Sequence, residues 1–238
     1  MPSPEEKGFG QGSADLSRWA EEVFRPEDDI LREIRERSVA AGLPAIQVGR
    51  FDGLHLEVLA RAFGAKRAVE IGTLGGYSGT CLLRGMGPGG LLDTFELEEK
   101  NAVVAYESFM RAGFRGQFRI HLGRALEELA SIESDGPFDL VFIDADKVGY
   151  PAYLDWAGEN LKIGGCVIGD NAFGWGGVAQ SDQEITMQPT ERRPAEIASI
   201  QGLREFSRKL ALPLEQGGRF RSTMIPTEEG LALGVKVL

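Results

Sequence analysis

The feature that most constrains the fold of this chain is a regular alternation of apolar and amphipathic segments between residues 67 and 170. Between the apolar segments, the spacing of apolar residues is that of helices of about 8–15 residues. The apolar segments predict strands at 67–72, 91–97, 117–122, 138–144 and 166–170. Strands that alternate with helices predict a doubly wound, mostly parallel sheet, and nearly unbroken apolar runs such as DLVFID predict helices on both of its faces.

Helices are expected to precede this core. Residues 1–15 are polar and rich in Gly, Pro and Ser, so we expect them to form a disordered tail. The apolar spacing over 16–41 and 53–63 predicts N-terminal helices. They form a helical extension, 16–63, ahead of a core at 64–171 that holds the predicted strands.

The pattern changes after the fifth predicted strand. A polar stretch with several glycines predicts a long loop at 172–193, placed to line a binding site because it directly follows that strand. A helix is expected over 194–211, and 218–225 and 231–237, joined by PTEEG, predict an antiparallel hairpin. No internal repeat or linker is visible, so we expect 16–238 to form one domain.

The composition argues against several classes of partner. The formal net charge is −10, from 26 Lys and Arg against 36 Asp and Glu, which disfavours binding to nucleic-acid phosphates or to an anionic membrane. No apolar run approaches the roughly 20 residues of a membrane span, and the first residues lack the parts of a secretory signal. The two cysteines, Cys81 and Cys166, lie in apolar stretches and are expected to be buried thiols. We therefore expect a cytoplasmic protein.

Ligands of open α/β sheets bind beyond the carboxyl ends of the strands, so the strand ends are the places to search for chemistry. The first strand ends in EIGTLGGYSG, where Gly72, Gly75 and Gly76 let the backbone approach a ligand and Ser78 is expected to cap the next helix. This is not the G-x-G-x-x-G spacing of a pyrophosphate-binding turn. The second strand ends in Glu96, where a carboxylate accepts hydrogen bonds from ribose hydroxyls unless it is merely solvated. Together these features predict a cofactor with an adenosine part.

Oxygen ligands follow the fourth and fifth strands. The fourth ends in FIDADK, with Asp144, Asp146 and Lys147, and the fifth ends in GDN, with Asp170 and Asn171. These strands are expected to be neighbours, so two carboxylates and an amide would meet at one edge and suit a hard cation such as Mg²⁺. The alternative is that Asp144 and Asp170 are helix N-caps or ion-pair partners of Lys147.

The segments VGRFDG, AKRAVEIGTLGGYSG, FDLVFIDADKVGYPAYL and IGDNAFGWGGV resemble the cation-dependent O-methyltransferase family. That family includes catechol and caffeoyl-coenzyme A O-methyltransferases and small bacterial relatives. The resemblance extends over about residues 28–238, and the DADK…DN pair is more specific than the glycine turn. It implies a Rossmann-like, S-adenosyl-L-methionine-dependent methyltransferase sheet of seven strands, whose last strand is antiparallel, in agreement with the terminal hairpin.

The resemblance also implies the residues of the site. The cofactor site would contain Val48, Glu70, Gly72, Thr73, Ser78, Glu96, Ala125 and Asp144. The ligands of the divalent cation would be Asp144, Asp170 and Asn171. Lys147 matches the proposed general base, so Lys147 and Asp144 are the expected catalytic residues. The acceptor would contact Lys147, Asp146, Asn171 and Trp175.

These expectations combine into a metal-dependent transfer of a methyl group from S-adenosyl-L-methionine to a hydroxyl of a small vicinal diphenol. A free phenol has a pKa of about 10 and is mostly neutral at pH 7, whereas a divalent cation stabilises the phenolate. Two adjacent hydroxyls bind the same ion, which also orients the attacking oxygen. The family further implies a homodimer.

Several other functions stay open. The acceptor could instead be a hydroxylated natural product, or a hydroxycinnamoyl-coenzyme A thioester whose phosphates would face Arg192 and Arg193. A non-catalytic protein that binds S-adenosyl-L-methionine would keep the same fold. An NAD-dependent dehydrogenase is disfavoured, because the glycine turn lacks G-x-G-x-x-G and no strand end offers a His or a Tyr/Lys pair for proton transfer.

Overall fold

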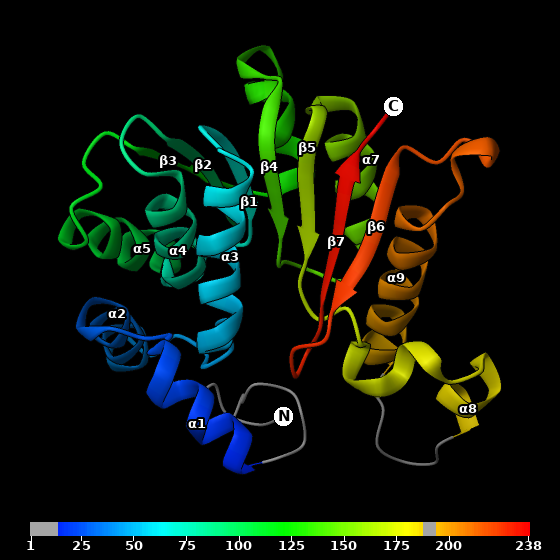
Figure 1. The fold of residues 1–238 in the computed structure, drawn as a ribbon, viewed down its shortest axis with the longest axis horizontal. Helices are drawn as coiled ribbons and strands as arrows, with labels where there is room; N and C mark the ends of the chain where they lie inside the picture. The colour runs from blue at the N-terminus through cyan, green and yellow to red at the C-terminus, as the bar shows by residue number, and fades with distance from the viewer. Residues whose placement is uncertain (1–13, 188–193) are drawn as a thin grey trace.

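The computed structural model describes residues 14–187 and 194–238, and within them seven strands form one sheet (Figure 1). The strands are β1 (Arg67–Ile71), β2 (Leu91–Glu96), β3 (Phe118–Leu122), β4 (Phe138–Ile143), β5 (Leu161–Gly169), β6 (Phe220–Ile225) and β7 (Leu231–Lys236). Their order across the sheet is β3-β2-β1-β4-β5-β7-β6. Strand β7 is antiparallel to both of its neighbours and the other pairs are parallel, which confirms the predicted sheet and its terminal hairpin.

Helices precede the sheet and connect its strands. The α-helices are α1 (Ala14–Phe24), α2 (Asp29–Ala40), α3 (Arg50–Ala62), α4 (Tyr77–Met86), α5 (Glu99–Arg111), α6 (Ala125–Glu128), α7 (Tyr150–Asn160), α8 (Asp182–Met187) and α9 (Pro194–Leu210). Short 3-10 helices are η1 (Leu129–Asp135), η2 (Gly174–Ala179) and η3 (Leu214–Gln216). Helices α1 to α3 form the predicted extension, and α2 begins after Asp28, whose carboxylate accepts a hydrogen bond from the Leu31 N–H at 3.0 Å.

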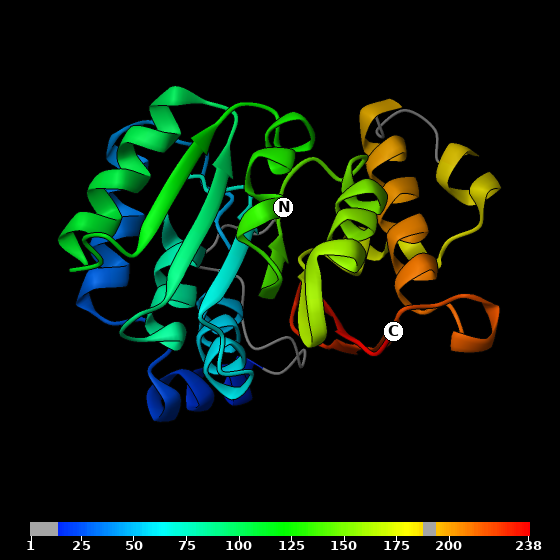
Figure 2. The same cartoon turned by 90° about the horizontal axis from the view of Figure 1, so that it is seen from above.

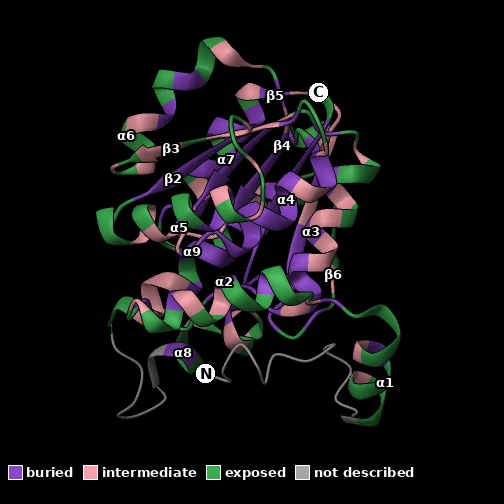
Figure 3. Cartoon of the chain, turned by 90° about the vertical axis from the view of Figure 1, so that its left-hand side faces the viewer, coloured by how far each residue is buried: buried purple, intermediate pink, exposed green. Residues whose placement is uncertain are grey.

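The sheet has a hydrophobic core on each face, because successive side chains of a strand point in opposite directions. Along β4, Leu140 and Phe142 pack with residues of α3, α4 and α5, whereas Val141 and Ile143 pack with residues of α7 and α9. Figure 2 shows these helices on the two sides of the sheet, and Figure 3 shows the central strands as the most buried part of the molecule. The two cores explain why the central strands have apolar rather than alternating sequences.

Three segments differ from the sequence-based prediction. The predicted loop at 172–193 contains the short helices η2 and α8. Each has six residues, which is too few to be recognised from apolar spacing. Residues 188–193 of the loop lie outside the described part of the chain. Strand β5 begins at Leu161 instead of 166, because Leu161 pairs with Phe138 ahead of a register shift. Helix α1 begins at Ala14, so the end of the expected disordered tail is helical, and residues 1–13 are not described.

Two smaller expectations concern the thiols and the membrane. Cys81 and Cys166 are free and buried, and burial raises the pKa of both thiols above the ordinary value, so the predicted buried thiols are confirmed. Among the helices of residues 14–187 and 194–238, none combines the length and the apolar character that crossing a membrane requires.

Candidate active site

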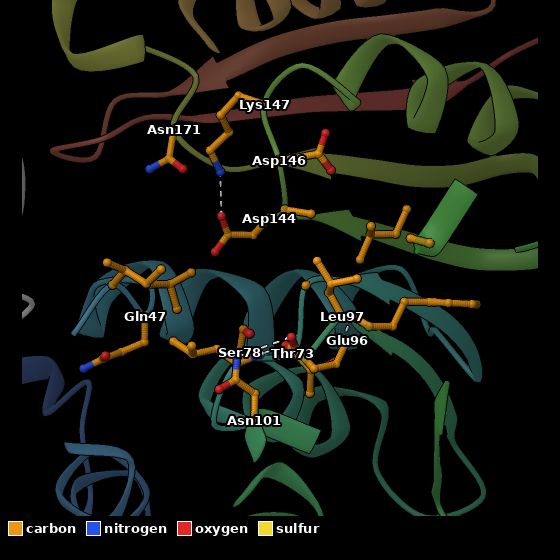
Figure 4. A pocket seen from close by; sticks show the side chains of 18 of the residues that line it. Gln47, Thr73, Ser78, Glu96, Leu97, Asn101, Asp144, Asp146, Lys147 and Asn171 are labelled. Atoms are coloured by element: carbon orange, nitrogen blue, oxygen red, sulfur yellow. Dashed lines mark hydrogen bonds and ion pairs between the residues drawn. The ribbon is translucent and has the colours of Figure 1, made fainter. Parts of the chain in front are cut away.

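The carboxyl ends of β1, β2, β4 and β5 open into one cavity of about 960 Å³, which is shown in Figure 4. Most of the predicted site residues line its wall, namely Val48, Gly72, Thr73, Ser78, Glu96, Ala125, Asp144, Asp146, Lys147, Asn171 and Trp175. The other two, Glu70 and Asp170, are buried behind that wall. A volume near the upper end of the ~300–1,000 Å³ typical of small-molecule sites gives room for a cofactor and a small acceptor together.

Gly72 brings the turn after β1 into direct contact with the end of β4. Its φ of +100° lies in the region that favours glycine, and a Cβ there would lie 2.0 Å from the carbonyl oxygen of Asp144. The Gly72 N–H donates to the carbonyl of Phe95 at 3.0 Å, and the Asp144 N–H donates to the carbonyl of Ile71 at 2.8 Å. The ends of β1, β2 and β4 are thereby fixed against one another at the cavity.

Glu96 is held toward the cavity by the glycine turn. Its Oε2 accepts a hydrogen bond from the Leu74 N–H at 2.8 Å, and its Oε1 accepts from the Glu98 N–H at 2.9 Å and from Asn101 Nδ2 at 3.3 Å. A carboxylate offers about four acceptor positions, so Glu96 has capacity left for a hydroxyl donor in the cavity. This geometry suits the predicted contact with a ribose.

Glu70 lies behind the turn, wholly buried. Its Oε1 accepts from the Ser78 hydroxyl at 2.6 Å and its Oε2 accepts from the Thr94 hydroxyl at 2.6 Å. Burial raises the pKa of Glu70 to about 8, although the two hydroxyl donors oppose that rise. The prediction that Ser78 caps α4 is wrong: the N-cap is Gly76, and the Ser78 hydroxyl donates to the buried Glu70 carboxyl instead.

The opposite wall of the cavity carries an ion pair from the loop after β4 (Figure 4). Lys147 Nζ donates to Asp144 Oδ1 and to the Tyr150 hydroxyl, at 2.8 Å in each case, and the Lys147 side chain is 12% exposed. Asp146 accepts a hydrogen bond from the Tyr153 hydroxyl at 2.6 Å. The ion-pair alternative that the sequence left open therefore holds for Asp144, while Lys147 remains part of the cavity wall.

Asp170 follows β5, which pairs with β4 in parallel. Its side chain is 2% exposed and its Oδ1 has no hydrogen-bond partner. Burial and the negative charges of Asp144 and Asp52 raise the pKa of Asp170 well above its ordinary value, and Lys147 opposes the rise. The next residue, Asn171, has a left-handed φ of +56° and lies at the same end of the cavity as Lys147 (Figure 4).

A hard divalent cation fits these donors. A buried carboxylate with an unpartnered oxygen beside a second carboxylate is unfavourable, and either a proton, as the raised pKa indicates, or a bound cation relieves it. Two carboxylates and an amide supply oxygens of the kind that Mg²⁺ prefers. In the described part of the chain, no three His, Cys, Asp or Glu side chains are arranged to hold a metal, so the third protein ligand would be the Asn171 amide.

Two tyrosines of α7 belong to the site and were missed from the sequence. Tyr150 and Tyr153 stand three and six residues after Lys147, and each hydrogen-bonds to a side chain of the DADK segment. The Tyr150 hydroxyl donates to the carbonyl of Ile143 at 3.0 Å, and burial raises the pKa of Tyr150 above its ordinary value, which keeps the hydroxyl neutral. The available signal was their spacing at the start of the helix that follows the ligand-bearing loop.

Known proteins resemble this chain in sequence and in fold. A family model described as O-methyltransferase matches residues 21–237. The catechol O-methyltransferase of Mycobacterium tuberculosis is 40% identical over 169 residues, 71% of this chain and 76% of that protein. The catechol O-methyltransferase of Niastella koreensis is 36% identical over 197 residues, 82% of this chain and 84% of that protein. The solved O-methyltransferase from Bacillus cereus in complex with SAH has a TM-score of 0.79 at 33% identity, over 93% of this chain and 97% of that chain.

The fold and the cavity thus define a Rossmann-like methyltransferase, with a glycine turn after β1 and an acidic residue at the end of β2. The chain belongs to the O-methyltransferase family. It is an S-adenosyl-L-methionine-dependent O-methyltransferase, and the resemblance seen in the sequence is confirmed. Membership of this family sets aside the NAD-dependent dehydrogenase. The expectation that no strand end offers a Tyr/Lys pair was wrong, because Lys147 donates a hydrogen bond to the Tyr150 hydroxyl just after β4.

Proposed function

We propose that this enzyme transfers the methyl group of S-adenosyl-L-methionine to one hydroxyl of a small vicinal diphenol, with a divalent cation held by Asp144, Asp170 and Asn171. The observation that carries this proposal is the unpartnered, buried oxygen of Asp170 beside a second carboxylate at the end of the cavity. The two relatives named catechol O-methyltransferase support the same acceptor class.

The cofactor is proposed to lie along the ends of β1 and β2. Glu96 accepts hydrogen bonds from the ribose hydroxyls, and Ala125 and Val48 give apolar contacts at the two ends of the cofactor. Ser78 and Thr73 contribute hydroxyls beside the glycine turn, and the buried Glu70 fixes the Ser78 hydroxyl at 2.6 Å. In this position the sulfonium of the cofactor supplies the methyl group as an electrophile.

The acceptor is proposed to lie at the Lys147 end of the cavity. A divalent cation there supplies the positive charge that lowers the pKa of a phenol hydroxyl from about 10. With a cation on Asp144, Lys147 in its neutral form would accept the proton of that hydroxyl, and the phenol oxygen would take the methyl group as its bond to sulfur breaks, which leaves the cofactor as a neutral thioether. Asp146 and Trp175 also line the cavity and would contact the acceptor ring.

A second hollow of about 730 Å³ adjoins the main cavity at Asn171 and supports an aromatic acceptor. Its lining includes Phe173 and Trp175, whose flat rings suit stacking against a phenol. Trp175 has a left-handed φ of +53°, and its indole Nε1 has no hydrogen-bond partner. Arg192 and Arg193, the residues expected to face a coenzyme A thioester, lie outside the described residues.

The experiment that tests this function is a methyl-transfer assay on catechols and matched mono-phenols. We expect the catechols to be methylated with Mg²⁺ present, the mono-phenols to react poorly, and an excess of chelator to abolish turnover that Mg²⁺ then restores. Undiminished methylation in chelated enzyme would refute the metal. Equal rates on mono-phenols would refute the vicinal diphenol, and methylation confined to a hydroxycinnamoyl-coenzyme A thioester would favour the alternative acceptor.

We also propose that the enzyme is a cytoplasmic homodimer. Helix α1 exposes Trp19, Val23 and Phe24, each more than half accessible, and clustered apolar side chains of this size are typical of a surface that contacts another protein. The two buried thiols of the enzyme, Cys81 and Cys166, suit a reducing compartment. Light scattering is expected to give twice the chain mass of 25.9 kDa, and a monomer mass would refute the dimer.

A further inference from the structure

Lys147 is held by two partners of different kinds. Its Nζ donates to the Asp144 carboxylate and to the Tyr150 hydroxyl, both at 2.8 Å. In the proposed function Asp144 is also a ligand of a divalent cation, so its carboxylate interacts with two positive charges. The Tyr150 hydroxyl has no such second task, because its proton is already donated to the backbone carbonyl of Ile143 at 3.0 Å.

Both the ring and the hydroxyl of Tyr150 are held by neighbouring residues. The residue is fully buried, and its ring contacts Phe206 of α9 edge to face, with the ring centroids 5.3 Å apart and the planes at 78°. Its hydrogen bond to Ile143 ties the hydroxyl to the last residue of β4. The remaining acceptor position of the hydroxyl is therefore directed at Lys147 Nζ.

Helix α9 also fixes the backbone from which Lys147 projects. Gly202 of α9 packs against this peptide so closely that a Cβ would lie 2.2 Å from the Lys147 carbonyl oxygen. On the other side of the loop, the Gly72 turn touches the carbonyl of Asp144. The loop from Asp144 to Lys147 is thus held between the cofactor turn and α9.

We propose that Tyr150 is a positioning residue that keeps Lys147 Nζ at the acceptor hydroxyl when Asp144 binds the cation. This inference rests on the proposed function, in which Lys147 acts on that hydroxyl. Tyr150 touches neither cofactor nor acceptor; its hydroxyl acts through Lys147 alone. Helix α9 contributes by locking both the Tyr150 ring and the Lys147 peptide.

The test is Tyr150→Phe, which keeps the ring against Phe206 and removes only the hydroxyl. We expect kcat on a catechol with Mg²⁺ to fall by about 10- to 100-fold, the range associated with misplacing a catalytic group by about an ångström. The KM for the catechol and the Kd for SAH, measured by calorimetry, are expected to change by less than about threefold. A merely structural role would instead lower thermal stability without this split between kcat and binding.

The double mutant of Tyr150→Phe with Lys147→Met shows whether Tyr150 affects kcat only through Lys147. If Tyr150 acts only through Lys147, adding Tyr150→Phe to Lys147→Met causes no further loss of kcat. Tyr106→Phe on α5 is the control for loss of a phenol hydroxyl, because Tyr106 is exposed and does not line the cavity. A full additional loss in the Lys147→Met background, or wild-type kcat in Tyr150→Phe, would overturn the proposal.

A readout that does not need turnover keeps this inference distinct from the proposed function. In enzyme without added metal, we expect the Lys147 amine to be acetylated faster in Tyr150→Phe than in wild type, as followed by mass spectrometry. If wild type methylates no catechol, the proposed function fails, while the labelling rate still decides whether Tyr150 holds Lys147. Should Tyr150→Phe fold poorly, Gly202→Ala displaces the same peptide from α9 and is expected to lower kcat while SAH binding is retained.

Discussion

Replacing Gly72 by Ala should damage stability and cofactor binding together. The substitution places a methyl group 2.0 Å from the Asp144 carbonyl oxygen, on a backbone with φ of +100°. An alanine in a left-handed conformation costs about 1–2 kcal/mol, and forcing extra volume into a packed site costs about 1–3 kcal/mol more. Because hydrogen bonds of 3.0 and 2.8 Å fix both backbones, the contact cannot relax freely. We expect the free energy of unfolding to fall by about 2–5 kcal/mol.

A matched control separates close approach from backbone strain. Gly113 has a similar φ of +89°, but nothing lies within 4 Å of the position that a Cβ would take there, so Gly113→Ala should lose only the strain part, about 1–2 kcal/mol. Urea unfolding of both variants gives the two free energies, and calorimetry with SAH gives the affinity, which we expect to fall only for Gly72→Ala. Equal destabilisation of the two variants, or unchanged SAH affinity in Gly72→Ala, would refute the reasoning.

Three further substitutions test the two ends of the cavity. Asp170→Asn should weaken Mg²⁺ binding by roughly tenfold or more while SAH affinity is retained. Calorimetry measures both affinities, with Asp155→Asn on α7 as the control. An unchanged Mg²⁺ affinity would remove Asp170 from the proposed ligands. Lys147→Ala should lower kcat by about 10²-fold or more with little effect on SAH binding, and wild-type kcat would exclude it as the base. The raised pKa of Glu70 means that the folded state keeps a proton that the unfolded state releases, so this residue's stabilising contribution is complete below its ordinary pKa of 4.5 and declines as pH rises toward 8. Glu70→Gln should flatten the dependence of urea stability on pH over that range, and an unaltered slope would contradict the assignment.

The regular parts of the fold could be predicted because their physics is local. Strands such as β4 are apolar throughout since each residue faces one of two cores, and that pattern is visible without knowing the partners. Helix α8 could not be found in this way, because six residues are too few for a period of 3.6 to show. The start of β5 was missed because Lys162 to Gly165 lack strand character, and the one pair with β4 ahead of them, Leu161 with Phe138, lies before a register shift.

From the residue pattern alone, cavity residues could be predicted where a strand end determines their position, whereas Val48 and Ala125, which also line the cavity, came from the family resemblance. Glu96, Asp144 and Asn171 follow strand ends, so the rule that ligands bind there was enough. The capping role expected of Ser78 was wrong, because its hydroxyl donates to the buried Glu70, which lies eight residues earlier in the chain. Tyr150 was missed because its importance lies in a hydrogen bond to Lys147. Its position at the start of the next helix was the available signal, but position alone does not show that the two side chains meet.

The order of strands in the sheet also separates the two substrates along the chain. In the proposed arrangement, the donor lies against the ends of β1 and β2 and the start of α6, whereas the acceptor lies against the ends of β4 and β5 and η2. The halves meet along the pairing of β1 with β4, and the backbones of Gly72 and Asp144 lie in close contact just beyond it. The acceptor specificity should therefore be separable from cofactor binding. Replacing residues 172–187 with the corresponding segment of another family member should change which phenol is methylated and leave the affinity for the methyl donor unchanged.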